Sequence, residues 1–344
     1  MEATIMKTFG NRSLFSFGLL SSLFFFLCAH AQAQSPDVEA AKKDGKVVIY
    51  GTVVPQIMNL LQRGFEKKYG IKVDYWRASA TKVMDRALTE WRAGRPGFDV
   101  VIAIRGAQLL MKKEGLFTRY VPPSSENFPA KFKDKDGILT AWRVTPVGIL
   151  YNTELVKPGE APKTLDDLLD PKWKKKIVMP DPTQHTSTAQ FLWNLEKIKG
   201  ERWLEYVRAL AKQQPHLLES MAPVPNTLAK GEGHLGITYL QYVTQVKGPL
   251  GFALMDKILT DTNDMALSSR AANPNAAKVF MEYACSLEGQ KTVAEAGEFV
   301  LYSGIYPVMK DADKVVSNMV FMDNPTEEQL KKLSAEFRQI FFAK

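Results

Sequence analysis

The sequence predicts an α/β protein with two doubly wound α/β lobes joined by a two-strand hinge. Three observations support this. Strand and helix patterns alternate over residues 46–113 and again over 144–254, and an extended stretch, Lys257–Leu267, follows them. Alternating strands and helices are typical of a sheet covered by helices on both faces. With 344 residues, of which 45% are hydrophobic and 24% are charged, the chain is long enough for two cores.

The first lobe begins with three strand–helix pairs. The first helix pattern places Ile57, Leu60 and Leu61 on one face, and Gly70 follows it as a helix-ending residue. The third strand is apolar after its first residue, as expected of a parallel strand buried on both faces. In chain order, the predicted elements are Lys46–Tyr50, Gln56–Tyr69, Ile71–Tyr75, Thr81–Trp91, Asp99–Ala103 and Ala107–Lys113.

The second lobe is predicted to begin after Trp142. Its first strand, Val144–Tyr151, is one crossing between the lobes, and Lys257–Leu267 is the return crossing. The elements predicted between them are Leu165–Leu169, Ile177–Met179, Thr186–Ile198, Glu201–Lys212, Leu235–Thr238, Tyr239–Val246 and Phe252–Leu254. Three tail helices are expected to close the first lobe: Asn275–Cys285, Leu287–Glu295 and Glu327–Phe342. We therefore expect residues 34–143 and 261–344 to form the first lobe and residues 144–260 the second.

The first 33 residues have the features of a cleaved secretory signal peptide. Lys7 and Arg12 give a basic start, and the apolar run Leu14–Cys28 leads to two Ala-x-Ala cleavage sites within residues 29–33. An uncleaved signal anchor is the alternative, but the run is short for a membrane span and the Ala-x-Ala sites favour cleavage. We expect the mature chain to begin near Gln34 and to work outside the cytoplasm.

Charge, cysteine content and the absence of catalytic motifs exclude several classes of function. The formal net charge of +8 is dispersed along the chain, which disfavours nucleic acid as a partner and suits small anionic ligands. Cys285 is the only cysteine after the signal, and its apolar helical surroundings favour a buried, inert thiol. The sequence has no Gly-x-Ser-x-Gly, no His-Glu-x-x-His and no glycine-rich phosphate loop. We therefore expect neither catalytic residues nor a cofactor.

Three segments resemble periplasmic solute-binding proteins of the ferric-iron type. Thr164–Ile177 is similar to their Leu-Leu-Asp-Pro-Lys-Trp-Lys segment, and Val147–Asn152 to their hinge strand ending in Tyr-Asn. Gly289–Lys291 followed by Ser303–Val308 is similar to their carboxy-terminal segment. The resemblance implies a type II periplasmic binding fold, a periplasmic location and delivery of ligand to the ABC permease in the inner membrane. We expect a monomer that closes its hinge on a small-molecule ligand.

Residues suited to anion binding follow several predicted strands or open predicted helices. Arg105 follows the third strand, where a guanidinium can hold a carboxylate or phosphate by two hydrogen bonds. Hydroxyl-rich helix starts can cap the helix and cradle an anion. Ordinary capping is the alternative for the hydroxyls, and a solvated loop charge is the alternative for Arg105. The predicted ligand-binding residues of this group are Thr52, Ser79, Thr81, Arg105, Thr186, Ser187 and Thr188.

Ferric iron is a second candidate ligand. The resemblance implies a His or Glu from the first lobe and adjacent tyrosines from the second, and this sequence has neither set. Tyr239 and Tyr242 are three residues apart on a predicted helix, so their hydroxyls can still converge on a ligand or metal. Tyr239 and Tyr242 are therefore added to the predicted ligand-binding residues. If ferric iron binds there, it is the transported ligand and not a cofactor. A secreted enzyme and a ligand-loaded sensor subunit are further alternatives.

Overall fold

The computed structural model describes residues 35–343 and has the predicted two-lobed α/β architecture. The main path of the curled sheet runs β2-β1-β3-β10-β5-β8-β6-β7. The predicted signal peptide lies outside the described residues. Among the described residues, no helix combines the length and the apolar character that a membrane span requires.

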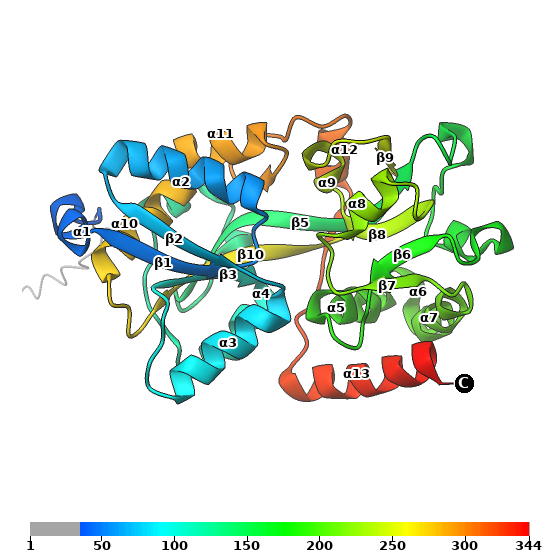
Figure 1. The fold of residues 1–344 in the computed structure, drawn as a ribbon, viewed down its shortest axis with the longest axis horizontal. Helices are drawn as coiled ribbons and strands as arrows, with labels where there is room; N and C mark the ends of the chain where they lie inside the picture. Colours follow the sequence, from blue (N-terminus) through cyan, green and yellow to red (C-terminus); the bar gives the residue numbers. More distant parts are fainter. Residues whose placement is uncertain (1–34, 344) are drawn as a thin grey trace, which may run out of the picture. The chain divides into compact units, whose positions relative to one another are not determined.

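The first lobe is built on parallel strands covered on both faces (Figure 1). Val47 and Ile49 pack with helices α2 and α10, whereas Tyr50 and Val101 pack with α3 and α4. This alternation follows from the two-residue period of a strand, and it confirms the doubly wound prediction. The elements are α1 Val38–Asp44, β1 Lys46–Gly51, α2 Pro55–Tyr69, β2 Lys72–Arg77, α3 Ala80–Arg92, β3 Val100–Ile104, α4 Arg105–Lys113 and β4 Phe117–Thr118.

Strand β5 (Leu139–Asn152) runs through both lobes. Its first part pairs with β10 (Ile258–Ser268), and its last residues pair with β8 (Leu235–Tyr239) and β9 (Leu250–Phe252). The predicted crossing strand Val144–Tyr151 thus lies within β5, and the predicted return strand Lys257–Leu267 corresponds to β10. The β10–β5 register shifts between Asn263 and Asp264, as in a β-bulge, which re-aims side chains at the junction of the lobes.

The second lobe is built on strands β6, β7 and β8. Its helices pack beside these strands, and the predicted helix over Thr186–Ile198 breaks at Leu195 into α5 and α6. The predicted helix Tyr239–Val246 is wrong in its first turn, because Tyr239 ends β8 and α9 begins only at Tyr242. The remaining elements are β6 Ile177–Pro180, α5 Thr186–Asn194, α6 Glu196–Lys199, α7 Trp203–Lys212, β7 His216–Leu218, α8 Val224–Ala229 and α9 Tyr242–Gln245.

The tail does not lie wholly on the first lobe. Helices α10 (Pro274–Cys285) and α11 (Leu287–Glu295) pack against α1 and α2, as expected. Helix α13 (Glu327–Phe342) instead packs against α5 and α7 of the second lobe. Asn194 fixes the segment before α13, since its amide group exchanges two hydrogen bonds with the Asp323 backbone. The remaining tail elements are β11 Phe299–Val300, α12 Ala312–Ser317 and β12 Met319–Phe321.

Candidate functional site

A small cavity, here called the inner cavity, lies between the lobes and has a volume of about 30 Å³. Thr52 follows β1, Arg77 ends β2 and Tyr239 ends β8, so strand ends from both lobes meet there. This is where open α/β sheets bind ligands. Its lining residues are Thr52, Arg77, Ala78, Ser79, Ala80, Ile104, Arg143, His185, Ser187, Ser220, Met221, Ala222, Tyr239, Tyr242 and Asn263.

Two arginines with unused hydrogen-bond donors line the inner cavity. The Nε atoms of Arg77 and Arg143 are buried, and neither has a hydrogen-bond partner in the described part of the chain. Arg143 is ion-paired with the fully buried Glu298, whereas Arg77 has no carboxylate within 4 Å among the described residues. A buried donor without a partner costs about 1–3 kcal/mol, so both positions favour an acceptor bound in the cavity.

Hydroxyl groups add to these donors. The buried hydroxyls of Ser187 and Ser220 have no hydrogen-bond partner among the described residues. Ser79 lies at the start of α3, where its side chain is 3.5 Å from the Lys82 nitrogen. The Thr52 hydroxyl accepts a hydrogen bond of 3.3 Å from the side-chain amide nitrogen of Asn263, and the side-chain oxygen Oδ1 of Asn263 accepts one of 3.1 Å from the Trp142 indole. The cavity therefore offers free hydroxyls beside a fixed polar wall.

The two predicted tyrosines line the same cavity although they do not share a helix. The rings of Tyr239 and Tyr242 are 5.7 Å apart in an edge-to-face arrangement. Burial raises the pKa of Tyr239 to about 12 and also raises the pKa of Tyr242. Both side chains are therefore neutral hydroxyl groups near pH 7, and such groups can donate a hydrogen bond to an anion.

Thr81 and Thr186 lie beside the inner cavity and connect the lobes. The Thr81 hydroxyl donates to the Gln184 carbonyl oxygen at 3.0 Å and accepts from the Thr186 nitrogen at 3.4 Å. Thr188 is buried, and its hydroxyl lies 2.8 Å from Nδ1 of His185. Burial, with a smaller effect from Arg77, lowers the pKa of His185 to about 4. Of the predicted hydroxyl residues, Thr52, Ser79 and Ser187 line the cavity, whereas Thr81, Thr186 and Thr188 do not.

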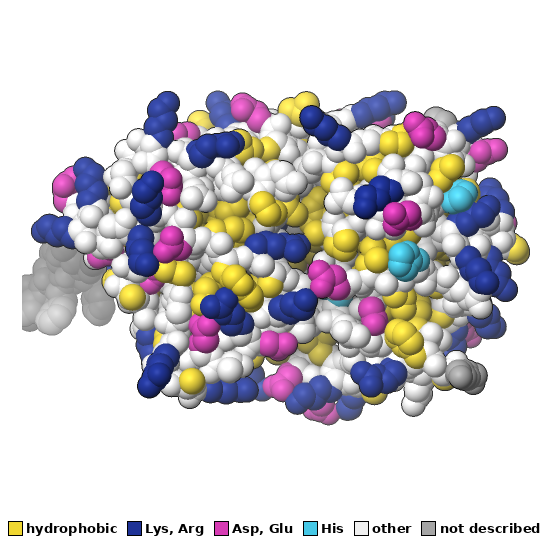
Figure 2. Space-filling view, in the orientation of Figure 1, with side chains coloured by type: hydrophobic (Ala, Val, Ile, Leu, Met, Phe, Trp, Pro, Cys, Tyr) yellow, Lys and Arg dark blue, Asp and Glu magenta, His cyan; other side chains and the backbone are white. Residues whose placement is uncertain are grey.

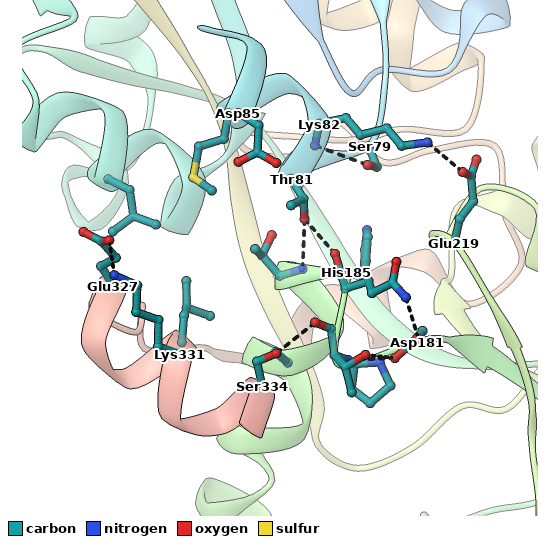
Figure 3. Close-up of a pocket in the computed structure, with 18 of the residues that line it drawn as sticks. Ser79, Thr81, Lys82, Asp85, Asp181, His185, Glu219, Glu327, Lys331 and Ser334 are labelled. Atoms are coloured by element: carbon teal, nitrogen blue, oxygen red, sulfur yellow. Dashed lines mark hydrogen bonds and ion pairs between the residues drawn. The ribbon is translucent and has the colours of Figure 1, made fainter. Parts of the chain in front are cut away.

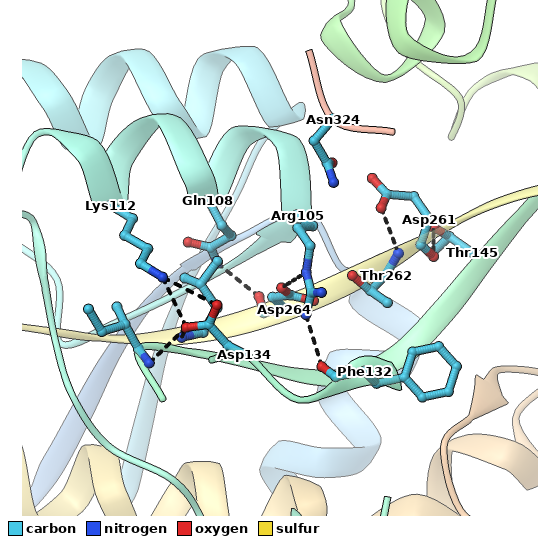
Figure 4. Close-up of polar contacts among 12 residues, drawn as sticks. Arg105, Gln108, Lys112, Phe132, Asp134, Thr145, Asp261, Thr262, Asp264 and Asn324 are labelled. Carbon is cyan, nitrogen blue, oxygen red and sulfur yellow. Dashed lines mark hydrogen bonds and ion pairs between the residues drawn. The ribbon is translucent and has the colours of Figure 1, made fainter. Parts of the chain in front are cut away.

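Arg105 is not brought to the inner cavity. Its Nε donates to Asp264 at 2.7 Å, and its guanidinium also donates to the Phe132 carbonyl oxygen at 3.1 Å (Figure 4). Asp264 is fully buried on β10, directly opposite Ala103 of β3. Strand pairing thus provides a carboxylate for Arg105 from within the chain, and the predicted cleft position becomes an internal ion pair.

Asp261 is a second buried carboxylate on β10 (Figure 4). One oxygen accepts from the Thr262 nitrogen at 2.8 Å, and the other has no partner among the described residues. Burial, reinforced by the nearby Asp264 charge, raises the pKa of Asp261 to about 7. This carboxyl group therefore keeps its proton well above the usual range of an aspartate.

The sequence prediction missed Arg143, Ser220 and Asn263, and it did not select Arg77. Arg143 did have a signal, because it interrupts the apolar stretch around Trp142 just before the predicted crossing strand. A charge in such a strand needs a partner or a ligand. Ser220 and Asn263 had no comparable signal, since their position depends on which strands and loops meet.

Positive charge is otherwise spread over the surface. Figure 2 shows lysines and arginines scattered across the visible face rather than gathered in one patch. In the part of the chain that the structure describes, no group of three or more His, Cys, Asp or Glu side chains is placed to hold a metal ion. The arginines of the inner cavity are therefore a local feature, and their positive potential favours an anion there.

Comparison with known proteins identifies the family. A family model described as "Bacterial extracellular solute-binding protein" matches residues 95–325. The chain belongs to this family. A solved structure similar to this solute-binding protein is that of the periplasmic binding protein AfuA from Actinobacillus pleuropneumoniae, with exogenous fructose-6-phosphate bound. The two share 22% sequence identity with a TM-score of 0.73, over 87% of this chain and 99% of AfuA.

Two curated relatives align with parts of this solute-binding protein. A "Probable ABC transporter periplasmic-binding protein y4fP" from Sinorhizobium fredii is 29% identical over 122 residues, which are 35% of this chain and 34% of that relative. "Iron uptake protein A1" from Synechocystis is 30% identical over 154 residues, which are 42% of this chain and 41% of that relative. The chain thus aligns with well under half the length of either relative.

Proposed function

We propose that this solute-binding protein delivers a small anion to an ABC importer from the periplasm and that the anion binds in the inner cavity. The observation that carries the proposal is the pair of buried, unpartnered Nε atoms on Arg77 and Arg143. Guanidinium groups are donors only, so they need an acceptor such as a carboxylate, phosphate or phosphonate. The y4fP relative supports an ABC partner through its printed description.

Hinge closure is the proposed mechanism of capture. Strand ends from both lobes line the cavity, and the Thr186 nitrogen of the second lobe donates a hydrogen bond to the Thr81 hydroxyl of the first. We propose lobes of residues 34–143 and 144–260, with the β10–α12 region completing the first lobe and α13 attached to the second. Closing the lobes buries the anion among donors of both and presents a new surface to the permease. The mechanism requires binding alone, so we propose a monomeric transport protein without catalytic activity.

Ferric iron is the second candidate, favoured by Tyr239 and Tyr242 in the cavity wall and by the relative described as an iron uptake protein. A bare ferric ion requires deprotonated or carboxylate oxygens. The raised pKa values of both tyrosines oppose deprotonation, and Arg77 and Arg143 line the same space. The anion therefore fits the cavity better than the cation.

Isothermal titration calorimetry tests this proposal with the chain beginning near Gln34. The titrants are phosphate, sulfate, short phosphonates, short carboxylates and a soluble ferric chelate. Arg77→Met should lower the affinity for the bound anion roughly thirtyfold or more, because a charge-assisted donor is lost from a buried site. Arg202→Met is the matched control, since Arg202 is exposed in the short helix Gly200–Arg202, outside the cavity lining.

The opposite outcome identifies an iron binder. Ferric binding that Tyr239→Phe and Tyr242→Phe abolish, while Arg77→Met leaves it intact, would refute the anion proposal. Amino-terminal sequencing of the protein recovered from the periplasm tests the location, with loss of the predicted signal expected.

A further inference from the structure

A second and much larger space adjoins the inner cavity. This outer groove, of about 860 Å³, runs between α3 and α4 of the first lobe and α13, β7 and the β6–α5 loop of the second. Ser79 and His185 line both the outer groove and the inner cavity. A ligand that reaches between these two residues would therefore occupy both spaces.

The wall of the outer groove combines apolar side chains with charged residues, six of which form ion pairs with one another, whereas Asp85, Lys113 and Asp181 form none among the described residues. Two of the ion pairs are Lys82 with Glu219 at 3.0 Å and Lys331 with Glu327 at 2.7 Å (Figure 3). Arg92 similarly pairs with Glu114 at 3.2 Å. The apolar lining comes from both lobes and includes Met84, Leu88, Leu110, Leu217, Leu218 and Leu330.

The two spaces thus have different chemistry. The inner cavity presents unused cationic donors, whereas the outer groove presents charges that are mostly ion-paired and partly exposed leucine and methionine side chains. The inner cavity has room for only about one or two water molecules, so in this arrangement it is too small for an organic ligand as a whole. Any organic part must lie outside it, and the outer groove is the adjoining space.

We propose that the ligand is an organic anion with an apolar tail, whose anionic head group binds in the inner cavity and whose tail lies in the outer groove. This inference rests on the proposed anion function and names its substrate class. The apolar wall includes Leu88 of α3 and Leu330 of α13. Because the two lobes each provide part of this wall, the tail also contributes to holding the lobes together.

A series of n-alkyl phosphonates and n-alkyl carboxylates with one, three and six carbons in the tail tests the inference by calorimetry. Burial of a methylene contributes enough for about a fourfold gain in affinity, and a partly open groove should give a two- to fourfold gain per methylene. We expect affinity to rise along at least one of the two series. Inorganic phosphate serves as the tail-free reference.

Two variants place a carboxylate in the outer groove. Leu330→Glu and, on the opposite wall, Leu88→Glu should remove most of the gain from the hexyl tail and leave the methyl compound unaffected. Gln339→Glu is the matched control, because it adds the same charge to an exposed position of α13 that does not line the groove. Thermal unfolding of each variant shows whether it is folded, and two groove variants keep the test usable if one is not.

The outcomes separate this inference from the function on which it rests. Equal affinity for all tail lengths would overturn the apolar tail and leave the anion site standing. A hexyl gain that survives both groove substitutions would place the tail elsewhere and also overturn it. If no head group binds in either series or as phosphate, the anion site is refuted, and the inference falls with it.

Discussion

Three arginines near the junction of the lobes differ in how fully the chain pairs their guanidinium groups. Arg105 donates to Asp264 and to a backbone carbonyl, so its guanidinium is engaged by the chain itself. Arg77 and Arg143 each retain a buried Nε without a partner among the described residues. A satisfied buried arginine stabilises a fold, whereas an unsatisfied one marks a place that a ligand can complete.

The difference comes from the neighbouring strand. Arg105 begins α4 at the end of β3, and β3 pairs with β10, which carries Asp264 opposite Ala103. Arg77 ends β2, which pairs with β1 and has no further neighbour along the main path of the sheet. Two arginines with similar sequence surroundings are thus assigned different roles by strand order. This comparison gives predictions that separate stability from binding.

The largest expected effect is on stability. Arg105→Met should lower the free energy of unfolding by about 3–5 kcal/mol, because it leaves the buried Asp264 carboxylate without its partner. Urea denaturation measures this loss. The double variant Arg105→Met/Asp264→Asn should recover part of it, and the affinity of the folded fraction for the anion should stay unchanged. If Arg105→Met instead keeps its stability and binds the anion more weakly, Arg105 belongs to the ligand-binding site.

Asp261→Asn should change how stability depends on pH. The folded pKa of Asp261 is raised to about 7 from an unfolded value near 3.9, so the wild type loses stability as pH rises from about 4 to 7. The asparagine variant lacks this loss, which is on the order of 3 kcal/mol. Denaturant midpoints at pH 4 and pH 8 provide the test, and we expect the variant to gain on the wild type only at the higher pH.

His185, which lines the inner cavity, should make stability depend on pH in the opposite direction from Asp261. Its folded pKa of about 4 lies below the unfolded value near 6.5, so the wild type loses stability as pH falls between these values. His185→Asn, which retains a polar group near Thr188, should remove about 2–3 kcal/mol of that pH dependence. Parallel stability curves for variant and wild type from pH 7 to pH 4 would contradict the lowered pKa.

The smallest expected effect concerns the contact between lobes. Thr81→Val keeps the shape of the side chain and removes its bonds to Gln184 and Thr186, which should cost about 0.5–1.5 kcal/mol. The ligand-free protein should shift toward an open form, and anion affinity should fall about two- to tenfold. Small-angle scattering and calorimetry measure the two effects. Thr89→Val, an exposed change on the same helix, should alter neither.

Local patterns in the sequence determined most of the fold. The periodicities over residues 46–113 predicted each strand and helix from β1 to α4, although not α1 or β4, and the terminal helix Glu327–Phe342 was predicted with the same bounds. Such patterns are reliable because a strand or helix buries one face whatever its partner is. They also identified Thr52, Ser79 and Ser187, since these residues follow a strand or open a helix, positions that face the cleft in this topology.

Only the tertiary structure decided which charges face the inner cavity. The bulged pairing of β5 with β10 sets Arg143 opposite Asn263 beside the cavity, while the pairing of β10 with β3 gives Asp264 to Arg105. The tertiary structure also decided that Tyr239 ends a strand and that α13 packs on the second lobe. A sequence specifies each side chain and its local element, but whether a charge finds an internal partner depends on residues far away along the chain. Strand order and register fix those neighbours, and these are properties of the assembled sheet.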